Sequence, residues 1–351
     1  MPALENSLPV IDLSSDSEAV IGQKLYEAAS TLGFFFIEGS GLTQEEVDEV
    51  FRLAEKFFAT PAEEKQKFPI TKNRGYSSFK QEGLDVDRRE NGQKKGDPKE
   101  LFNFAPFAET ANPGSEVQPL PPTFADSRET IAVFTERCHK LAQRLLEALG
   151  LALEVEPGWL SSRHALDRPG GCTLRILHYP AMADIEGPDD EIRAGAHTDY
   201  GSMTLLFQRE AQSGLEVLSP VTGEWISVPA LGPRAPGQCA PIVVNIADQL
   251  SFWFGGVLRS AYHRVRFSTA AQRTGKDRYS MAYFVHPASD VLLEPIPSRV
   301  IAAAIASAGE SLPENKSEKE QRNAEVRRTV IDGRVLTAGE HLARRLALAF
   351  S

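Results

Sequence analysis

The feature that most constrains the fold is a series of short apolar segments that begins at Thr173 and continues to about residue 287. The segments are rich in Val, Ile, Leu and aromatic residues, and turn residues separate them, which is the pattern of strands in an all-β sheet. The predicted strands are Leu174–Tyr179, Met203–Gln208, Leu215–Leu218, Trp225–Val228, Ile242–Ile246, Ser260–Val265 and Tyr279–Val285. Seven strands in about 115 residues predict a sandwich or barrel of the jelly-roll kind.

Helical signals flank this region, so the expected fold class is mainly β with flanking helices. The predicted helices are Ser17–Leu32 ended by Gly33, Thr43–Phe58 with a Thr43/Glu46 capping box, Asp126–Leu149 boxed by Glu129 and ended by Gly150, and Ala338–Phe350. We expect an N-terminal mixed α/β region over residues 1–125 that packs on the core. A helix and the barrel would form the catalytic core over 126–300, and 301–351 would hold a polar segment (Glu314–Arg328) and the closing helix.

Composition excludes several classes of function. The 48 acidic and 38 basic residues give a net charge of −10, which disfavours nucleic acid or an anionic membrane as the main partner. No apolar run approaches the roughly 20 residues of a membrane helix, and the first residues lack a signal-peptide pattern. Cys138, Cys172 and Cys239 form neither a disulfide framework nor a zinc cluster. A reduced, cytoplasmic location is therefore expected.

A metal motif occurs in His197-Thr198-Asp199. Residues at i and i+2 point to the same face of a strand or of its end, and His263 in a later predicted strand is the natural third ligand. Two imidazoles and one carboxylate form the facial triad of non-haem Fe(II) oxygenases, which leaves coordination positions open for a bidentate co-substrate and O₂. His-x-Asp alone is common in surface turns, so the interpretation depends on its context.

That context is a second motif, Arg278-Tyr279-Ser280, on a predicted strand. Arg278 and Ser280 share a face, where a guanidinium beside a hydroxyl can clamp a carboxylate. Tyr179 would add a phenolic hydrogen bond. The alternative is an arginine at the barrel rim that pairs with a nearby acid.

Taken together, these motifs resemble the 2-oxoglutarate- and Fe(II)-dependent dioxygenases of the isopenicillin N synthase-like superfamily. The likeness covers about residues 8 to 287. The segments that carry it are Pro9–Leu13, Gly33–Phe36, Arg74–Tyr76, Asp97-x-Lys99-Glu100-x-Phe102, His197–Gly201, His263–Val265 and Arg278-x-Ser280. Within the superfamily, Leu174–Pro180, Arg193–Gly201 and Arg278–Phe284 are most similar to fungal thymine hydroxylase-type members. One departure is Ala247 in Asn245-Ile246-Ala247-Asp248, where many relatives carry glycine; this matters only if the backbone there has a positive φ.

The resemblance implies a distorted double-stranded β-helix core in which His197, Asp199 and His263 hold Fe(II). It implies that Arg278 and Ser280, with help from Tyr179, bind the distal carboxylate of 2-oxoglutarate. It further implies that 2-oxoglutarate and O₂ are consumed, that succinate and CO₂ are formed, and that ascorbate stimulates the reaction. The expected substrate is a small organic molecule, such as a secondary metabolite or a pyrimidine, and the expected outcome is oxidation by hydroxylation.

The residues that meet this substrate are the least constrained by sequence. Candidates are Tyr200, Phe284, Tyr76, Phe102 and Phe104, each of which is also a plausible core residue. The other histidines are interpreted as packing, surface or loop residues. Three alternatives to the dioxygenase stay open at this point: a 2-oxoglutarate-independent Fe(II) oxidase of the same superfamily, a catalytically silent binding protein, and a zinc hydrolase, in which the Arg-x-Ser pair would have no role.

Overall fold

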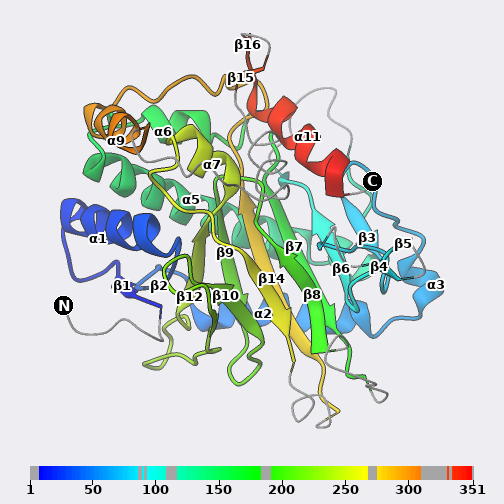
Figure 1. Ribbon diagram of the computed structural model, residues 1–351. Helices are drawn as coiled ribbons and strands as arrows, with labels where there is room; N and C mark the ends of the chain where they lie inside the picture. Colours follow the sequence, from blue (N-terminus) through cyan, green and yellow to red (C-terminus); the bar gives the residue numbers. More distant parts are fainter. Residues whose placement is uncertain are drawn as a thin grey trace.

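A computed structural model describes residues 8–85, 89–90, 93–107, 117–182, 191–267, 275–309, 330–331 and 334–349. Two β-sheets form its centre (Figure 1). The eight-stranded sheet has the order β1 (Val10–Asp12), β2 (Phe34–Glu38), β12 (Ile242–Ile246), β9 (Met203–Gln208), β14 (Arg278–Val285), β7 (Thr173–Tyr179), β6 (Glu100–Phe104) and β3 (Gly75–Ser77). The four-stranded sheet has the order β11 (Trp225–Ser227), β10 (Leu215–Leu218), β13 (His263–Arg266) and β8 (Ile192–His197).

The seven strands expected from sequence are all present. Three of them, Met203–Gln208, Leu215–Leu218 and Ile242–Ile246, have the expected bounds, and the largest shift is in β13, which begins at His263 rather than Ser260. Strands from the N-terminal region extend the large sheet at both edges, because β2 pairs with β12 and β6 pairs with β7. Two short hairpins, β4 (Arg89–Glu90) with β5 (Gln93–Lys94) and β15 (Val330–Ile331) with β16 (Arg334–Val335), lie outside the two sheets.

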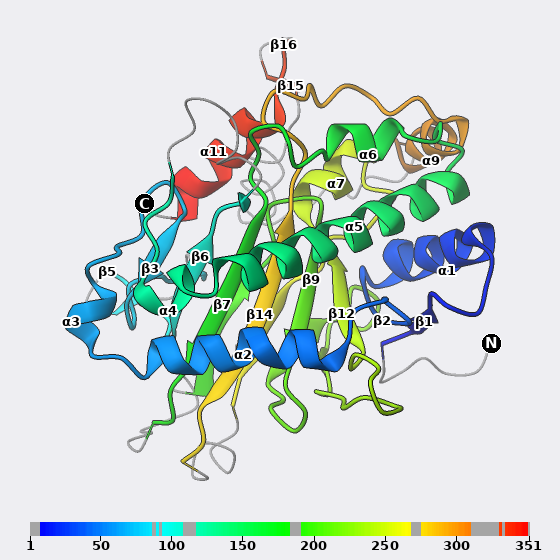
Figure 2. The ribbon, with the colours of Figure 1, turned by 180° about the vertical axis from the view of Figure 1, so that it is seen from behind.

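Helices cover the outer face of the large sheet, where α2 and α5 lie across its strands (Figure 2). The helices are α1 (Glu18–Thr31), α2 (Gln44–Phe58), α3 (Ala62–Lys65), α4 (Pro122–Ala125), α5 (Arg128–Ala152), α6 (Trp159–Arg163), α7 (Asp248–Trp253), α9 (Arg299–Gly309) and α11 (Ala338–Ala349). The predicted capping box is confirmed: Thr43 and Glu46 bond each other's backbone groups at the start of α2. The main hydrophobic core fills the space between the large sheet and the helices that cover its outer face.

Both predicted ends of the long helix are wrong. Asp126 ends α4, and α5 starts after Ser127 without a side-chain cap, so Asp126 and Glu129 form no capping box. Gly150 does not stop the helix, which continues to Ala152. A Cβ at Gly150 would lie 3.3 Å from Leu160 Cδ1 of α6. The glycine therefore serves close packing rather than chain reversal.

Residues Glu314–Arg328, predicted as a polar segment, lie outside the described residues. In the part of the chain that the structure describes, no helix combines the length and the apolar character that crossing a membrane requires.

Two histidines outside the metal motif link the helices to the barrel. His139 on α5 is 3% exposed; its Nδ1 lies 3.0 Å from Tyr283 Oη and its Nε2 lies 2.6 Å from the carbonyl oxygen of His164. His164 in turn places Nε2 2.7 Å from Ser202 Oγ. These residues are buried bracing groups, so the helix-packing interpretation of His139 holds and the surface interpretation does not.

Their burial predicts that acid lowers stability. Burial lowers the pKa of His139 and lowers that of His164 to about 4, whereas a histidine in the unfolded chain titrates near 6.5. Below pH 6.5 the unfolded chain therefore binds protons that the folded chain does not. The stabilisation from keeping these histidines neutral is fully present above about pH 6.5, and the free energy of unfolding falls as the pH is lowered toward 4. For His164 the expected loss at pH 5 is about 2 kcal/mol in the free energy of unfolding. Urea unfolding at pH 7 and pH 5 measures it. The difference between the two pH values should shrink in His164→Gln; an undiminished difference would assign the acid sensitivity to other groups.

Candidate active site

Strand pairing brings together the three residues proposed as metal ligands. His197 ends β8, His263 begins β13, and the two are direct partners in the antiparallel register. Their ring centroids are 4.2 Å apart. Asp199 follows two residues beyond β8, and its Oδ1 lies 3.8 Å from Nε2 of His197 and 3.6 Å from Nε2 of His263. One ligand atom from each residue lies within 4.8 Å of the other two.

Hydrogen bonds aim the correct atoms of these side chains at a common point. Nδ1 of His197 lies 2.8 Å from the carbonyl oxygen of Gly195, and Nδ1 of His263 lies 3.3 Å from that of Ala261. A carbonyl only accepts hydrogen bonds, so Nδ1 carries the proton and the lone pair is on Nε2. This is the tautomer that a metal ligand requires.

The carboxylate of Asp199 is oriented in the same way. Its Oδ2 accepts hydrogen bonds from Thr204 Oγ1 at 2.6 Å and from Asn245 Nδ2 at 2.8 Å, which leaves Oδ1 facing the two imidazoles. Thr204 on β9 and Asn245 on β12 are themselves direct cross-strand partners. The large sheet therefore holds the aspartate, while the small sheet carries both histidines.

The protonation states also suit a cation. Burial, with a further effect of His263, lowers the pKa of His197 to about 4, so its imidazole is neutral at neutral pH. Burial alone would raise the pKa of Asp199, but the two imidazoles and the hydrogen bonds from Thr204 and Asn245 outweigh it and lower the pKa. A neutral imidazole at His197 and an ionised carboxylate at Asp199 are the deprotonated forms that bind a divalent metal.

Removing one orienting hydrogen bond should weaken metal binding without removing a ligand. Thr204→Val keeps the shape of the side chain but lets Asp199 rotate, and partners of this kind typically contribute 10–100-fold in metal affinity. We expect Fe(II) affinity to fall by about that range, measured by anaerobic titration. Thr31→Val, which removes an exposed hydroxyl on α1, is the control. Equal affinities in both variants would show that Asp199 needs no such support.

A second group of polar side chains lies further along the same interior face. Alternation on β14 puts Arg278 and Ser280 on this face; Tyr179 of β7 pairs with Arg278, and Gln208 of β9 pairs with Ser280. Arg278 Nη1 is 3.4 Å from Ser280 Oγ, Nη2 is 3.1 Å from Gln208 Oε1, and Nε is 2.9 Å from the carbonyl oxygen of Gln212. The guanidinium lies 5.0 Å from the ring centroid of Tyr179.

Arg278 is 4% exposed, and burial lowers its pKa. Its hydrogen-bond partners within the described residues are neutral, whereas the alternative from sequence placed it beside an acid at the rim. A buried guanidinium surrounded by neutral groups is a site for an anion, because burying an uncompensated charge is costly.

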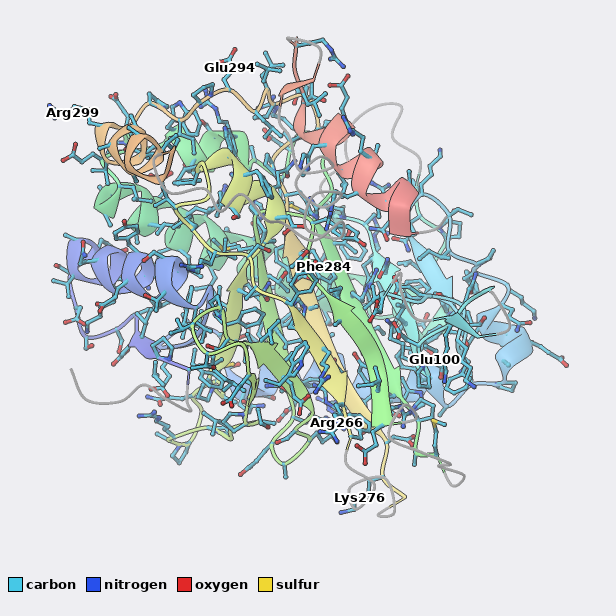
Figure 3. All side chains as sticks on the ribbon, in the orientation of Figure 1. Glu100, Arg266, Lys276, Phe284, Glu294 and Arg299 are labelled. Atoms are coloured by element: carbon cyan, nitrogen blue, oxygen red, sulfur yellow. The ribbon has the colours of Figure 1, made fainter. Side chains whose placement is uncertain are left out.

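Beside the triad lies a cavity of about 70 Å³. It is lined by Asn73, Glu82, Gly83, Leu84, Gly171, Thr173, Arg175, His197, Thr198, Asp199, Tyr200, Phe284, His286, Leu342 and Leu346. Tyr200 and Phe284, two of the candidates from sequence, are among these residues. Phe284 lies near the centre of the molecule, below α11 in the view of Figure 3.

The other three candidates lie elsewhere. Tyr76, Phe102 and Phe104 are at most 4% exposed and belong to the core on the helix side of the large sheet. Phe102 contacts Phe57 of α2, with ring centroids 5.3 Å apart. On β6 it is Leu101 and Asn103 that face the interior, because alternate residues of a strand point to opposite faces.

The cavity also holds charged groups that the sequence interpretation missed. Arg175 of β7 lies with its guanidinium 5.2 Å from the ring centroid of Phe284, and its Nε donates to Asn103 Oδ1 at 2.9 Å. Its Nη1 is 3.3 Å from Glu82, which is also 3.0 Å from Lys99 Nζ. Burial would raise the pKa of Glu82, but these two cations outweigh it and lower the pKa to about 2.

The Asp97-x-Lys99 motif now has a structural explanation. Lys99 Nζ bonds Asp97 Oδ2 at 2.9 Å, and Asp97 Oδ1 accepts the backbone N–H of Gly195 at 2.9 Å. The carbonyl of the same Gly195 orients His197. The N-terminal region thus supports one iron ligand from outside the barrel.

The substitution of glycine by Ala247 has no conformational cost. Ala247 has φ −106° and ψ 170°, an extended conformation that is sterically allowed for any residue. It is the N-cap of α7, so the turn before Asp248 is intact.

Comparisons with known proteins agree with this geometry. Residues 8–123 match a family model described as the N-terminal region of the non-haem dioxygenase in morphine synthesis, and residues 170–287 match the 2OG-Fe(II) oxygenase superfamily. The UPF0676 protein of Schizosaccharomyces pombe is 36% identical over 295 residues, which cover 82% of this chain and 84% of that protein. A 2-oxoglutarate-dependent dioxygenase of Didymella fabae is 32% identical over 311 residues, which cover 81% and 88%.

Among solved structures, the full-length thymine 7-hydroxylase of Neurospora crassa in complex with alpha-KG and 5-formyluracil superimposes with a TM-score of 0.73 at 25% identity, covering 99% of this chain and 98% of that one. The predicted jelly-roll core is therefore confirmed; the structure builds it from an eight-stranded and a four-stranded sheet. The motifs, the fold and the matches agree, and the chain belongs to the 2OG-Fe(II) oxygenase superfamily as a dioxygenase that uses 2-oxoglutarate and binds Fe(II) through a His-x-Asp…His triad.

Proposed function

We propose that this dioxygenase hydroxylates a small, ring-containing organic molecule that binds in the cavity beside the triad. The observation that carries the proposal is the lining of this cavity, which combines two aromatic side chains, Tyr200 and Phe284, with the ion pair of Arg175 and Glu82; His197 and Asp199 line the same cavity. Bound Fe(II) supplies the chemistry that activates O₂, with 2-oxoglutarate as the co-substrate that is converted to succinate and CO₂. The protein's task is to bind and orient both organic molecules and to exclude water.

Arg278, Ser280 and Tyr179 are the residues proposed to bind the distal carboxylate of 2-oxoglutarate. Supporting this role, the guanidinium is buried beside the Ser280 hydroxyl and its hydrogen-bond partners among the described residues are neutral. A carboxylate that enters supplies the missing counter-charge and accepts charge-assisted hydrogen bonds. The location also suits a linear diacid, because the clamp and Thr204, which supports Asp199, lie on the same interior face of the large sheet.

For the substrate, the aromatic side chains favour a planar ring. Stacking on Tyr200 or Phe284 adds about 0.5–1.5 kcal/mol beyond burial. Arg175 offers hydrogen-bond donors to a carbonyl or other acceptor on the ring. The complexes of the related Neurospora crassa hydroxylase with 5-formyluracil and with thymine make a pyrimidine one member of this class, and a cyclic secondary metabolite is the broader expectation.

The test is turnover of 2-oxoglutarate by the purified protein with Fe(II), ascorbate and thymine. Succinate formation that thymine stimulates, together with a hydroxymethyl product, would establish a pyrimidine substrate. A panel of cyclic metabolites with the same succinate readout covers the wider class. Absence of stimulation by every ring compound, with stimulation by an acyclic substrate, would overturn the proposal. Product formation without succinate would instead favour the 2-oxoglutarate-independent oxidase.

A further inference from the structure

The C-terminal helix α11 forms one wall of the cavity. It lies at the upper end of the barrel in Figure 1. Leu342 and Leu346 line the cavity, and His341 and Arg345 on adjoining positions are 0% and 8% exposed. Helix α11 packs closely against the barrel, since a Cβ added at Gly171, which precedes β7, would lie 2.6 Å from Leu342 Cδ2. The inward face of α11 is thus packed on the residues that surround the metal site.

Arg345 on this face contacts the segment that carries two iron ligands. Its Nη2 is 2.5 Å from Asp248 Oδ2 and 3.3 Å from Oγ1 of Thr198, the residue between His197 and Asp199. Thr198 Oγ1 in turn donates to Asp248 Oδ2 at 2.9 Å. Asp248 is fully buried, so this ion pair lies inside the protein.

Arg345 also faces the cavity's aromatic lining. Its guanidinium lies 4.8 Å from the ring centroid of Tyr200. A cation over an aromatic face at this distance is attracted by the ring, more strongly when both are desolvated. Arg345 therefore contacts both the segment between the ligands and a side chain that we propose meets the substrate.

Helix α7 completes the connection between α11 and the ligand segment. The backbone N–H of Asp248 donates to the carbonyl oxygen of Asp199 at 2.8 Å, and that of Gln249 donates to Gly201 at 2.9 Å. Gln249 Nε2 donates to the carbonyl oxygen of Ala338, the first residue of α11, at 3.1 Å. The start of α7 is therefore bonded to residues 199–201 on one side and to α11 on the other.

We propose that Arg345 is a positioning residue for the reaction. Its ion pair with Asp248 holds α11 against the ligand segment and fixes the Tyr200 ring, so that the cavity wall and the substrate-facing aromatic side chain keep their places. The ligand atoms themselves are oriented by Gly195, Ala261, Thr204 and Asn245. Loss of Arg345 thus affects the substrate side of the site and leaves Fe(II) and 2-oxoglutarate binding nearly intact. The role in catalysis rests on the proposed function, whereas the docking of α11 does not.

Hydrogen–deuterium exchange of the full-length protein tests the docking without a substrate. In Arg345→Gln we expect amide exchange in residues 338–349 and 197–201 to become at least tenfold faster. Fe(II) and 2-oxoglutarate affinities should stay within threefold of wild type, and exchange in α2 and α5 should be unchanged. Arg344→Gln, the same substitution at the preceding and less buried position of α11, is the matched control and should change none of these.

Two further variants keep the test decisive if Arg345→Gln does not fold. Asp248→Asn should give the same localised increase, because it removes the other half of the ion pair. Arg345→Lys keeps the charge and should restore at least part of the slow exchange. The combined effect of Arg345→Gln and Asp248→Asn should be smaller than the product of the two single effects, since both remove one interaction.

Three results would overturn the proposal: exchange of α11 within twofold of wild type in Arg345→Gln and Asp248→Asn, an equal increase in Arg344→Gln, or faster exchange spread over the whole chain. With thymine as the probe substrate, Arg345→Gln should raise KM at least tenfold and change kcat less than threefold. If the wild type does not turn over thymine, this result rejects only the pyrimidine substrate. The docking of α11 is still tested, because the exchange experiment needs no substrate.

Discussion

Asp199→Ala is expected to abolish turnover and to weaken Fe(II) binding by at least about 100-fold. Loss of a residue that merely supports a ligand typically costs 10–100-fold in metal affinity, and the loss of a charged ligand costs at least as much. Among the described residues Asp199 is the one carboxylate in this group of candidate ligands, so its loss leaves two imidazoles and no anionic ligand. Anaerobic Fe(II) titration and succinate formation measure the two effects.

The control for this experiment is Asp126→Ala, which removes an exposed carboxylate beyond the end of α4. Substitution of His139 or His341 is a poor control, because both side chains are buried and their loss would disturb packing. Asp199→Asn keeps the shape of the side chain and guards against misfolding of the alanine variant. Near-native iron affinity and turnover in both Asp199 variants would reject this residue as a ligand.

Arg278→Gln is expected to raise the KM for 2-oxoglutarate by about 10–150-fold while Fe(II) still binds. A hydrogen bond to a charged group contributes about 1.5–3 kcal/mol, and a buried guanidinium that meets a carboxylate is of this kind. Glutamine keeps hydrogen-bonding capacity but has no charge, so the co-substrate loses its ionic partner. The measurement is succinate formation as a function of 2-oxoglutarate concentration, together with Fe(II) affinity.

Arg264→Gln is the matched control, because Arg264 is adjacent to His263 but pairs with Glu216 at 2.6 Å and contacts the ring of Trp225. This arginine should leave the KM unchanged. An unchanged KM in Arg278→Gln would place the co-substrate carboxylate elsewhere.

The strands of the barrel and the His-x-Asp part of the triad could be predicted because their signals are local, whereas His263 was assigned from its later predicted strand and from the resemblance to the superfamily. Strand alternation predicted that His197 shares a face with Asp199 and that Arg278 shares a face with Ser280. Runs of hydrophobic residues indicated where the strands lie. The same rule could have found Arg175, which shares a face of β7 with Tyr179. It was overlooked because an arginine in a strand is most often exposed to solvent.

The remaining features depend on tertiary contacts that no local pattern reports. Strand β6 was missed because Glu100 and Asn103 interrupt its apolar pattern; both are buried by partners far along the chain, Lys65 and Arg175. The continuation of α5 through Gly150 depends on packing against Leu160. The ion pair between Arg345 and Asp248 joins residues from helices that are far apart in sequence.

The cross-strand pairing of His197 with His263 has a consequence for biosynthesis. The two imidazoles belong to β8 and β13, which can pair only after β9 to β12 have been synthesised. A ribosome-bound chain that ends between residues 199 and 263 therefore contains only one histidine and the aspartate of the triad. High-affinity iron uptake therefore has to follow closure of the small sheet. A truncated or stalled product that ends before residue 263 should therefore bind Fe(II) weakly.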